Sequence, residues 1–219
     1  MLWNNQAYRP LETLLYDNII APAVDELSAK TAKELAASLK PGAKLLDVGC
    51  GGGQLAVRLA GLRADLVING LDLSPRQVER ARKRAAVAGA QAEFFQGSAL
   101  NLPFKSETYD LVYSIASIKH WPDYMAGLRE CMRVVKPGGL LMVVEVDKNC
   151  TKETAAAFTS RWRLPGFMKP GALFFFRTFV SSRSITLNEA RQLAEALTAK
   201  KFDTGLYSDN LCWIIMAEK

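Results

Sequence analysis

Four glycines stand within five positions directly after a short apolar run, in Leu45-Leu-Asp-Val-Gly-Cys-Gly-Gly-Gly-Gln54. Glycine weakens the interior of a helix or a strand, but it allows positive φ and lets the backbone approach a ligand closely. In open α/β sheets, ligands bind beyond the carboxyl ends of the strands. The turn that follows Val48 is therefore the first candidate for a binding loop.

The residues around these glycines restrict the ligand. A dinucleotide-binding turn has the pattern G-x-G-x-x-G/A. Gly49 and Gly51 fit this pattern, but Gln54 occupies its third position. Asp47 lies two residues before the first glycine, where a fixed carboxylate would repel a pyrophosphate. A ligand that carries positive charge at this point fits better.

Alternating strands and helices must position this loop. Apolar runs predict strands at residues 44–48, 66–73, 92–96, 109–114 and 140–146, with helix-length segments between them. Residues 10–39 have helical spacing, and Ser74-Pro75-Arg76-Gln77 predicts a helix start with a capping box. Strands that alternate with helices form a parallel sheet covered on both faces.

The last part of the chain predicts a reversal of strand direction. Thr186 is expected to cap a helix that runs to about Lys200. Two further strands, 202–207 and 211–217, are joined by only three residues, which allows a hairpin alone. The predicted fold class is therefore α/β, with a doubly wound, mostly parallel seven-stranded sheet and an antiparallel C-terminal strand.

The overall composition is that of a globular protein of 219 residues, with 49% hydrophobic and 23% charged residues. No apolar run approaches the ~20 residues that span a bilayer, and the N-terminus lacks the layout of a signal peptide. The four scattered cysteines favour reduced thiols in a cytoplasmic protein and argue against a metal site. The net charge of +6 leaves nucleic acid, anionic lipid and acidic small molecules open as partners.

Residues of about 40–146 resemble the class I S-adenosylmethionine-dependent methyltransferases, in particular the small-molecule branch with the ubiquinone and menaquinone methylases. That family has an acidic residue followed by G-x-G-x-G, and Asp47-Val-Gly49-Cys-Gly51-Gly-Gly53 matches it. The resemblance implies a Rossmann-like fold with S-adenosyl-L-methionine as cofactor. It also implies that Asp47 favours the ammonium group of the cofactor and that Asp72 binds both ribose hydroxyls.

Three further segments extend the resemblance. Residues 96–104 look like the segment that lines the adenine, with Ser98 where the family often has aspartate. A serine hydroxyl can still accept from the adenine amino group, without a charge. Residues 109–114 and 133–139 look like the fourth strand and the turn into the fifth. The implied cofactor-binding residues are Asp47, Gly49, Cys50, Gly51, Gly53, Asp72, Leu73, Gly97, Ser98, Ala99 and Ser114.

Each of these motifs alone has a simpler interpretation. The glycine turn alone fits generic nucleotide binding, and Asp72 alone is as well explained as a helix cap. The order and spacing of the whole set favour the methyltransferase interpretation.

Methyl transfer from a sulfonium is an in-line displacement in which the enzyme aligns the reactants at ~3 Å and excludes water. A base is required only when the acceptor must lose a proton. His120, the only histidine, follows the fourth predicted strand and is the candidate catalytic residue. The alternative is a structural ring that binds the loop before a helix that begins near Asp123.

The same loop argues against some relatives. Enzymes that methylate adenine or glutamine amide nitrogens carry a [DN]-PP-[YFW] motif after the fourth strand, where this chain has Ser114-Ile-Ala-Ser117. A catalytic cysteine for pyrimidine C5 methylation is also missing from this loop.

Residues 151–183 differ most from the core pattern, because they hold six basic residues against one acidic residue, six of the ten phenylalanines, and Trp162. The resemblance implies that this insertion and the N-terminal helix form a lid over the acceptor. Aromatic and basic residues there suggest an apolar acceptor with an anionic group, or a membrane-facing surface. Alternatively, the aromatics only pack the lid and the basic residues are solvated. The candidate acceptor-binding residues are Tyr16, His120, Trp121 and Phe175, with Tyr8 as a further possibility.

A second basic cluster lies on the helix after the second strand and is interpreted as a solvated helix face. Its members are Arg76, Arg80, Arg82, Lys83 and Arg84.

The chain is expected to form one methyltransferase domain. Its parts would be an N-terminal helical cap (1–39), a cofactor-binding core (40–146), a lid-like insertion (147–185) and a C-terminal helix with a hairpin (186–219). The leading function is methyl transfer to a small, apolar and anionic acceptor that is lipid- or quinone-like, with peripheral membrane contact as an option. The alternatives are an RNA or protein methyltransferase, which the missing nucleic-acid module disfavours, and a non-catalytic cofactor-binding protein. The acceptor atom and the oligomeric state are left open.

Overall fold

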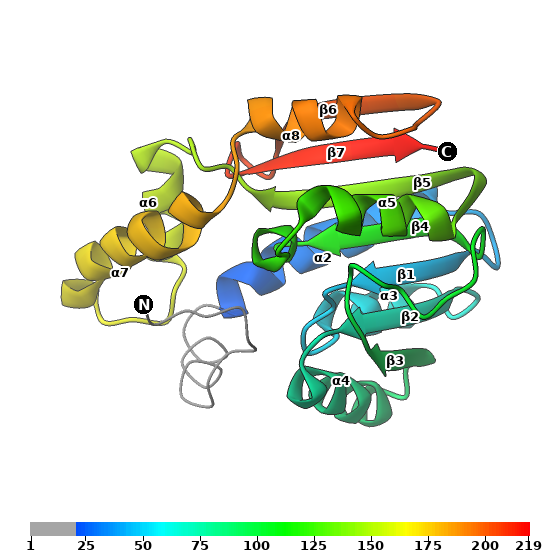
Figure 1. Ribbon diagram of the computed structural model, residues 1–219. Helices are drawn as coiled ribbons and strands as arrows, with labels where there is room; N and C mark the ends of the chain where they lie inside the picture. Colours follow the sequence, from blue (N-terminus) through cyan, green and yellow to red (C-terminus); the bar gives the residue numbers. More distant parts are fainter. Residues whose placement is uncertain (1–20) are drawn as a thin grey trace.

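A seven-stranded sheet with the strand order β3-β2-β1-β4-β5-β7-β6 forms the centre of the molecule (Figure 1). The computed structural model describes residues 21–219, with side chains from residue 25 onward. The pairs from β3 to β5 are parallel, whereas β7 runs antiparallel to both β5 and β6. This confirms the predicted fold class. The strands are β1 Lys44–Val48, β2 Val67–Asp72, β3 Ala92–Gln96, β4 Tyr109–Ile115, β5 Val135–Val146, β6 Lys201–Tyr207 and β7 Cys212–Glu218.

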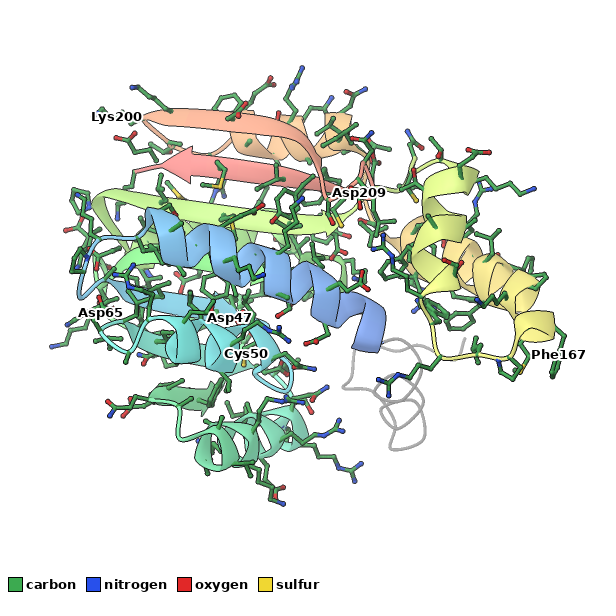
Figure 2. The ribbon with its side chains drawn as sticks, turned by 180° about the vertical axis from the view of Figure 1, so that it is seen from behind. Asp47, Cys50, Asp65, Phe167, Lys200 and Asp209 are labelled. Carbon is green, nitrogen blue, oxygen red and sulfur yellow. The ribbon has the colours of Figure 1, made fainter. Side chains whose placement is uncertain are left out.

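Helices cover both faces of this sheet. One face packs against α2 (Ala21–Ser38), α3 (Gln54–Leu62) and α4 (Pro75–Ala88), and the other against α5 (Tyr124–Val134) and α8 (Leu187–Glu195) (Figures 1 and 2). Because successive strand residues point to opposite faces, Leu45 enters the first core and Leu46 the second. Burial on both faces explains why the parallel strands are almost continuously apolar.

The strand order reverses at β1, which lies between β2 and β4. The chain leaves β1 toward α3 and β2 on one side, and it leaves β4 toward α5 and β5 on the other. In doubly wound sheets, such a reversal opens a crevice at the carboxyl ends of the two strands. The loop of residues 49–53 and the loop of residues 116–123 lie on the two sides of this position.

The two predicted capping boxes have different outcomes. Thr186 and Glu189 form both halves of a capping box at the start of α8, as predicted. Ser74 precedes α4 and Pro75 begins it, but the Ser74 side chain makes no capping hydrogen bond. The Ser74 N–H donates to Asp72 Oδ1 at 2.8 Å, so the group that Gln77 would bind in a capping box is already occupied.

Two element boundaries differ from the prediction by about five residues. β5 begins at Val135, five residues early, because Val135 pairs with Tyr109 before the register shifts and Leu140 pairs with Leu111. α8 ends at Glu195, and tight turns through Leu197 and Ala199 lead into β6. The β6–β7 hairpin is present, and its connecting residues Ser208, Asp209 and Asn210 all adopt positive φ.

The segment between β5 and α8 is a group of short helices. Figure 1 shows α6 and α7 to one side of the sheet, beyond the carboxyl ends of the parallel strands. Phe158, Trp162 and Phe176 are buried among these helices, with the Phe158 and Phe176 ring centroids 5.2 Å apart. The elements are α6 Lys152–Ser160, η3 Gly166–Met168, α7 Lys169–Phe175, the π-helical η4 Phe176–Val180 and η5 Ser181–Arg183.

Residues 10–20 of the predicted N-terminal helix, with Tyr16, lie outside the described residues, as does Tyr8. In the part of the chain that is described, no helix combines the length and the apolar character needed to cross a membrane.

Candidate functional site

The glycine loop folds back over the end of β2. Gly49, Gly51 and Gly53 all have positive φ, a backbone conformation that residues other than glycine rarely adopt. The N–H groups of Gly49 and Cys50 both donate to the Leu71 carbonyl oxygen, at 2.7 and 3.0 Å. A Cβ on Gly53 would lie 2.8 Å from the Ala81 side chain and 2.9 Å from the Phe94 ring. Gly53 is therefore required by packing inside the protein and not only by a ligand.

Two arginines of α4 hold the loop and β3 in place. The Arg84 guanidinium donates to the Gly52 carbonyl oxygen, and Arg82 donates twice to the Phe94 carbonyl oxygen, at 2.6 and 3.1 Å. The interpretation of this basic cluster as a purely solvated helix face is therefore wrong for these two residues. Helical periodicity placed them on the outer face, but an arginine is long enough to reach around it.

Asp72 is fixed at the carboxyl end of β2. Its Oδ2 accepts from the Gly51 N–H at 2.9 Å and its Oδ1 from the Ser74 N–H at 2.8 Å. Each carboxylate oxygen retains a second lone pair, so the group can still accept from two hydroxyls. Burial raises the pKa of Asp72, and the two N–H groups oppose this shift. The geometry is that of a pre-oriented acceptor for a diol.

Asp47 is buried at the end of β1, only 4% exposed, and lies opposite Tyr113 of β4 in the parallel register. Burial, and secondly the charge of Asp72, raise the pKa of Asp47 to about 8. The buried Tyr113 hydroxyl opposes this shift, although it has no well-formed hydrogen bond within the described part of the chain. The coupling between the two carboxyls shows that they share one region, where a cationic ligand would favour the ionised form of both.

Cys50 lies beside both carboxyls as a buried thiol. Burial and the charges of Asp47 and Asp72 raise its pKa, so the thiol stays protonated. Its Sγ lies next to Gly70, where a Cβ would approach it to 3.0 Å. The side chain thus packs in the core, and the backbone of Cys50 is already bonded, its N–H to Leu71 and its carbonyl oxygen to the Gly53 N–H at 3.0 Å. Leu73, in contrast, extends an exposed side chain directly after Asp72.

The segment after β3 also joins this edge. The Gly97 N–H donates to the Asp72 carbonyl oxygen at 3.0 Å, and a Cβ on Gly97 would lie 2.8 Å from Leu71 Cδ1. Ser98 Oγ accepts from the Leu100 N–H at 3.2 Å, so its proton and one lone pair are left for a ligand. Ala99 is half-buried next to it.

The Ser114 side chain is not brought to this edge. It is fully buried, and its hydroxyl has no hydrogen-bond partner among residues 21–219. Because Tyr113 faces the first core together with Asp47, its neighbour Ser114 points to the opposite face of β4.

The loop after β4 is pressed onto the glycine loop. A Cβ on Gly49 would overlap the Ser117 side chain, which shows how closely the two loops approach. Ser117 Oγ accepts from Trp121 Nε1 at 3.3 Å, and the buried Trp121 ring packs on Gly127 of α5. Ser117 therefore lies where the two loops meet, a position that its sequence context did not single out.

A buried ion pair joins the loop after β4 to strand β5. Lys119 Nζ lies 2.8 Å from Glu145 Oε1 and also donates to the Ala116 carbonyl oxygen at 3.0 Å. Glu145 is fully buried on β5 and accepts from the Val146 N–H at 2.9 Å, while the Lys119 side chain is 9% exposed. Sequence reasoning missed this pair. The available signal was one carboxylate within the otherwise apolar Leu140-Leu-Met-Val-Val-Glu-Val146.

His120 ends a 3-10 turn, η2 Ile118–His120, and is an exposed residue. Partial burial of the ring, with the positive charges of Lys119 and Arg183, lowers its pKa below the usual value. His120 is therefore neutral at pH 7 but a weaker base than an ordinary histidine.

Among the described residues, the acceptor candidates Trp121 and Phe175 lie in different parts of the structure. Trp121 lines a hollow of about 420 Å³ between the start of α5 and α8, which Asp47 and Asp72 do not line. Phe175 belongs to the lid, where its ring centroid lies 6.4 Å from that of Trp162. The remaining lining residues of the hollow are Pro122, Asp123, Tyr124, Met125 and Leu193. Among the described residues, no group of three His, Cys, Asp or Glu side chains is placed to hold a metal ion.

The sheet order, the antiparallel β7 and the acidic glycine loop define the class I methyltransferase fold. A crystal structure of an S-adenosylmethionine-dependent methyltransferase from Aquifex aeolicus superimposes with a TM-score of 0.71, 18% identity and coverage of 96% of this chain and 98% of that one. The plantazolicin methyltransferase BpumL, crystallised with S-adenosylhomocysteine (SAH) and a monoazolic desmethylPZN analogue, gives a TM-score of 0.71 at 16% identity, over 96% and 91% of the two chains.

Sequence comparison finds methyltransferases over part of the chain. Residues 46–143 match the methyltransferase domain family Methyltransf_11. The chain is 35% identical over 122 residues to the 27-O-demethylrifamycin SV methyltransferase of Amycolatopsis mediterranei, covering 54% of this chain and 44% of the relative. It is 32% identical over 139 residues to a ubiquinone biosynthesis O-methyltransferase of Cereibacter sphaeroides, covering 63% and 56%. Residues 46–143 are thus similar to methyltransferase domains, and the chain has the fold of that class. It spans about half the length of these curated relatives.

Replacing Asp47 by asparagine should remove a pH dependence of stability. The folded protein keeps a proton on Asp47 up to about pH 8, whereas the unfolded chain loses it near pH 3.8. The unfolding free energy of the wild type therefore falls as pH rises between these values, by at most about 1.4 kcal/mol per unit, and levels off above pH 8. Asp47→Asn should flatten this slope in urea titrations from pH 5 to 9. Asp203→Asn, at an exposed position on β6, is the control, and equal slopes in all three proteins would contradict the assignment.

Breaking the buried ion pair should be costly. Glu145→Gln or Lys119→Met alone leaves an uncompensated buried group, which typically destabilises a protein by about 3–5 kcal/mol. The double variant Lys119→Met/Glu145→Leu should recover much of this loss. Lys83→Met, which breaks the exposed Lys83–Glu79 pair, should change stability by only about 0.5 kcal/mol. Calorimetry measures all four, and single variants as mild as Lys83→Met would show that the pair does not hold the loop.

Proposed function

We propose that this protein is an S-adenosylmethionine-dependent methyltransferase that acts on a small apolar acceptor. The observation that carries the proposal is the convergence of Asp47 and Asp72 on the glycine loop at the strand-order reversal. A buried carboxyl with a raised pKa, next to a second carboxylate, is a costly arrangement without a cationic ligand. The cofactor carries an ammonium, a sulfonium and a ribose diol, and these groups complement the two carboxylates.

The described residues fit the cofactor as follows. Asp72 accepts from the ribose hydroxyls, because two backbone N–H groups already fix its orientation. Asp47 favours the ammonium group, and the backbone of Gly49, Cys50, Gly51 and Gly53 approaches the methionine part. Leu73 and the segment of Gly97, Ser98 and Ala99 line the adenine. Ser114, whose side chain faces the core, takes part through its backbone.

The cofactor supplies an activated methyl group with a neutral leaving group, so the protein mainly positions the acceptor and excludes water. Ser117 and the loop that carries it contribute to positioning, since the Lys119–Glu145 pair holds this loop against Gly49. We infer in-line displacement from this division of tasks. No step requires a base unless the acceptor must lose a proton.

The acceptor is inferred from the lid and from the relatives. Residues 147–185 form the lid over the crevice at the carboxyl edge, and their aromatic side chains favour an apolar acceptor with an anionic group. Two relatives are named for ubiquinone biosynthesis and for demethylrifamycin, which supports a quinone-like or related apolar small molecule. Trp121, Phe175, His120 and Tyr16 are the proposed contacts. The protein would act in the cytoplasm as one domain with the parts given above.

Cofactor binding is tested by calorimetry with S-adenosylhomocysteine. We expect the wild type to bind it and Asp72→Asn to bind it about 10–100-fold more weakly, because a charge-assisted acceptor is lost. Asp65→Asn removes an exposed carboxylate at a distant loop and should leave the affinity unchanged. Circular dichroism checks that each variant is folded. Absent binding by the wild type, or tighter binding of a nicotinamide or flavin nucleotide, would refute the proposal.

The acceptor class is tested by transfer of labelled methyl from S-adenosylmethionine to quinols, extracted lipids, RNA and protein. We expect label in the quinol or lipid fraction. Label in RNA or protein would favour the alternative methyltransferase classes instead. Tight cofactor binding without transfer to any fraction would favour a non-catalytic binding protein.

His120 is proposed to contact the acceptor as a neutral hydrogen-bonding group and not as the general base, because its pKa is lowered. His120→Gln should therefore raise KM for the acceptor several-fold and leave the shape of the pH profile of kcat between pH 6 and 9 unchanged. Lys105→Gln, on a surface loop, serves as the control. An acidic limb, in which kcat rises with pH, that disappears in His120→Gln would show that this residue is the base after all.

A further inference from the structure

The lid carries an exposed apolar patch that its own core leaves uncovered. Phe167 is 85% exposed and Phe174 66% exposed, and Met168, Phe175 and Phe179 are exposed as well. These five residues lie within thirteen positions, 167–179. Five of the twelve exposed large hydrophobics of the described residues thus fall in this one segment.

Helical spacing explains why these side chains point outward. Ala172 and Phe176 are buried four residues apart, and Phe176 packs on Phe158 and Trp162. Phe167 and Phe174 are seven residues apart, which places them on one common side, away from this inner face. Figure 2 shows Phe167 at the tip of the lid, far from the sheet. The lid therefore already has a core without these aromatics.

Exposed basic residues lie close to the patch along the chain. Lys169 lies on α7 with Phe174, Arg177 follows in η4, and Arg163 precedes η3; all three are exposed. The segment 151–183 has Glu153 as its single acidic residue against six basic ones. Single exposed apolar residues are ordinary, but a cluster with one sign of charge marks an interaction surface.

We propose that this patch docks the protein on the surface of an anionic phospholipid bilayer. Phenylalanine side chains insert at the boundary between headgroups and acyl chains, and lysine and arginine pair with anionic headgroups. A protein partner would require complementary acidic residues, and the charge here is complementary to the membrane surface as a whole. Because the patch lies on the lid, beyond the carboxyl edge of the sheet, docking would bring the candidate site to the lipid phase, where an apolar acceptor would be dissolved.

The test is sedimentation of the full chain with vesicles of phosphatidylglycerol and phosphatidylcholine in equal parts, compared with vesicles of phosphatidylcholine alone. We expect binding to the mixed vesicles only, and its loss as salt is raised from about 0.05 to about 0.5 M. Phe167→Ser/Phe174→Ser should weaken the partition about tenfold or more. Lys169→Glu/Arg177→Glu should weaken it by a similar factor at low salt and by less at high salt.

Matched controls come from α4. Val87→Ser removes another exposed hydrophobic residue, 91% exposed, and Arg76→Glu/Lys83→Glu reverses two exposed charges there. Both controls should bind vesicles like the wild type. Wild-type protein that does not sediment with the mixed vesicles, or α4 variants as impaired as the lid variants, would overturn the proposal.

Two further measurements distinguish membrane docking from self-association and from damage to the cofactor site. Light scattering should give the same mass for the wild type and Phe167→Ser/Phe174→Ser; a dimer that only this variant dissociates would mean that the patch binds a second copy, and would also overturn the proposal. Calorimetry should give both lid variants the wild-type affinity for S-adenosylhomocysteine. Membrane docking and the proposed methyl transfer can thus fail independently.

Discussion

The structure depends on one costly arrangement, two carboxylates held together at the carboxyl edge of a parallel sheet. The register of β1 and β2 pairs Asp47 with Gly70, so that Asp72 follows two residues later at the same edge. Burial raises the pKa of both groups, the charge of Asp72 raises that of Asp47 further, and two N–H groups of the surrounding loops partly compensate at Asp72. Two buried carboxyls with raised pKa values in an otherwise apolar sheet are typical of a ligand site. The glycine loop contacts Asp72 through the Gly51 N–H and the neighbouring loop at Ser117.

The second constraint is the contact between the loops that follow β1 and β4. Gly49 lacks a side chain where Ser117 approaches, and Ser117 in turn accepts a hydrogen bond from the buried Trp121 ring. The buried Lys119–Glu145 pair fixes this loop to β5. A buried ion pair is weak evidence for stability, because its desolvation cost offsets much of its attraction. Its value here is positional, since it holds one defined loop conformation beside the candidate site.

The lid differs from the sheet because it has both buried and exposed aromatic side chains. Its inner aromatics, Phe158, Trp162 and Phe176, form a small core that packs the short helices together. Its outer aromatics are exposed and accompanied by basic residues. The two interpretations of this segment from sequence, packing and surface recognition, therefore describe two faces of the same helices. The lid can therefore bind an acceptor with the face that is turned toward the crevice. Its opposite face can bind a surface that is both apolar and charged, such as an anionic membrane.

The sequence alone predicted the fold class and the order of the elements, because apolar strands and glycine turns are local signals, and the Asp47–Gly53 pattern gave the resemblance to methyltransferases. It also located Asp72, whose distance from Asp47 along the chain is one strand-and-helix unit. Only the tertiary structure showed that Arg84 and Arg82 bind backbone carbonyls, that Ser114 faces away from Asp47, and that Glu145 pairs with Lys119. These facts depend on the direction and reach of side chains across strands that are distant in sequence. Sequence periodicity predicts the face of a helix or strand on which a residue lies, but not which groups its side chain contacts there.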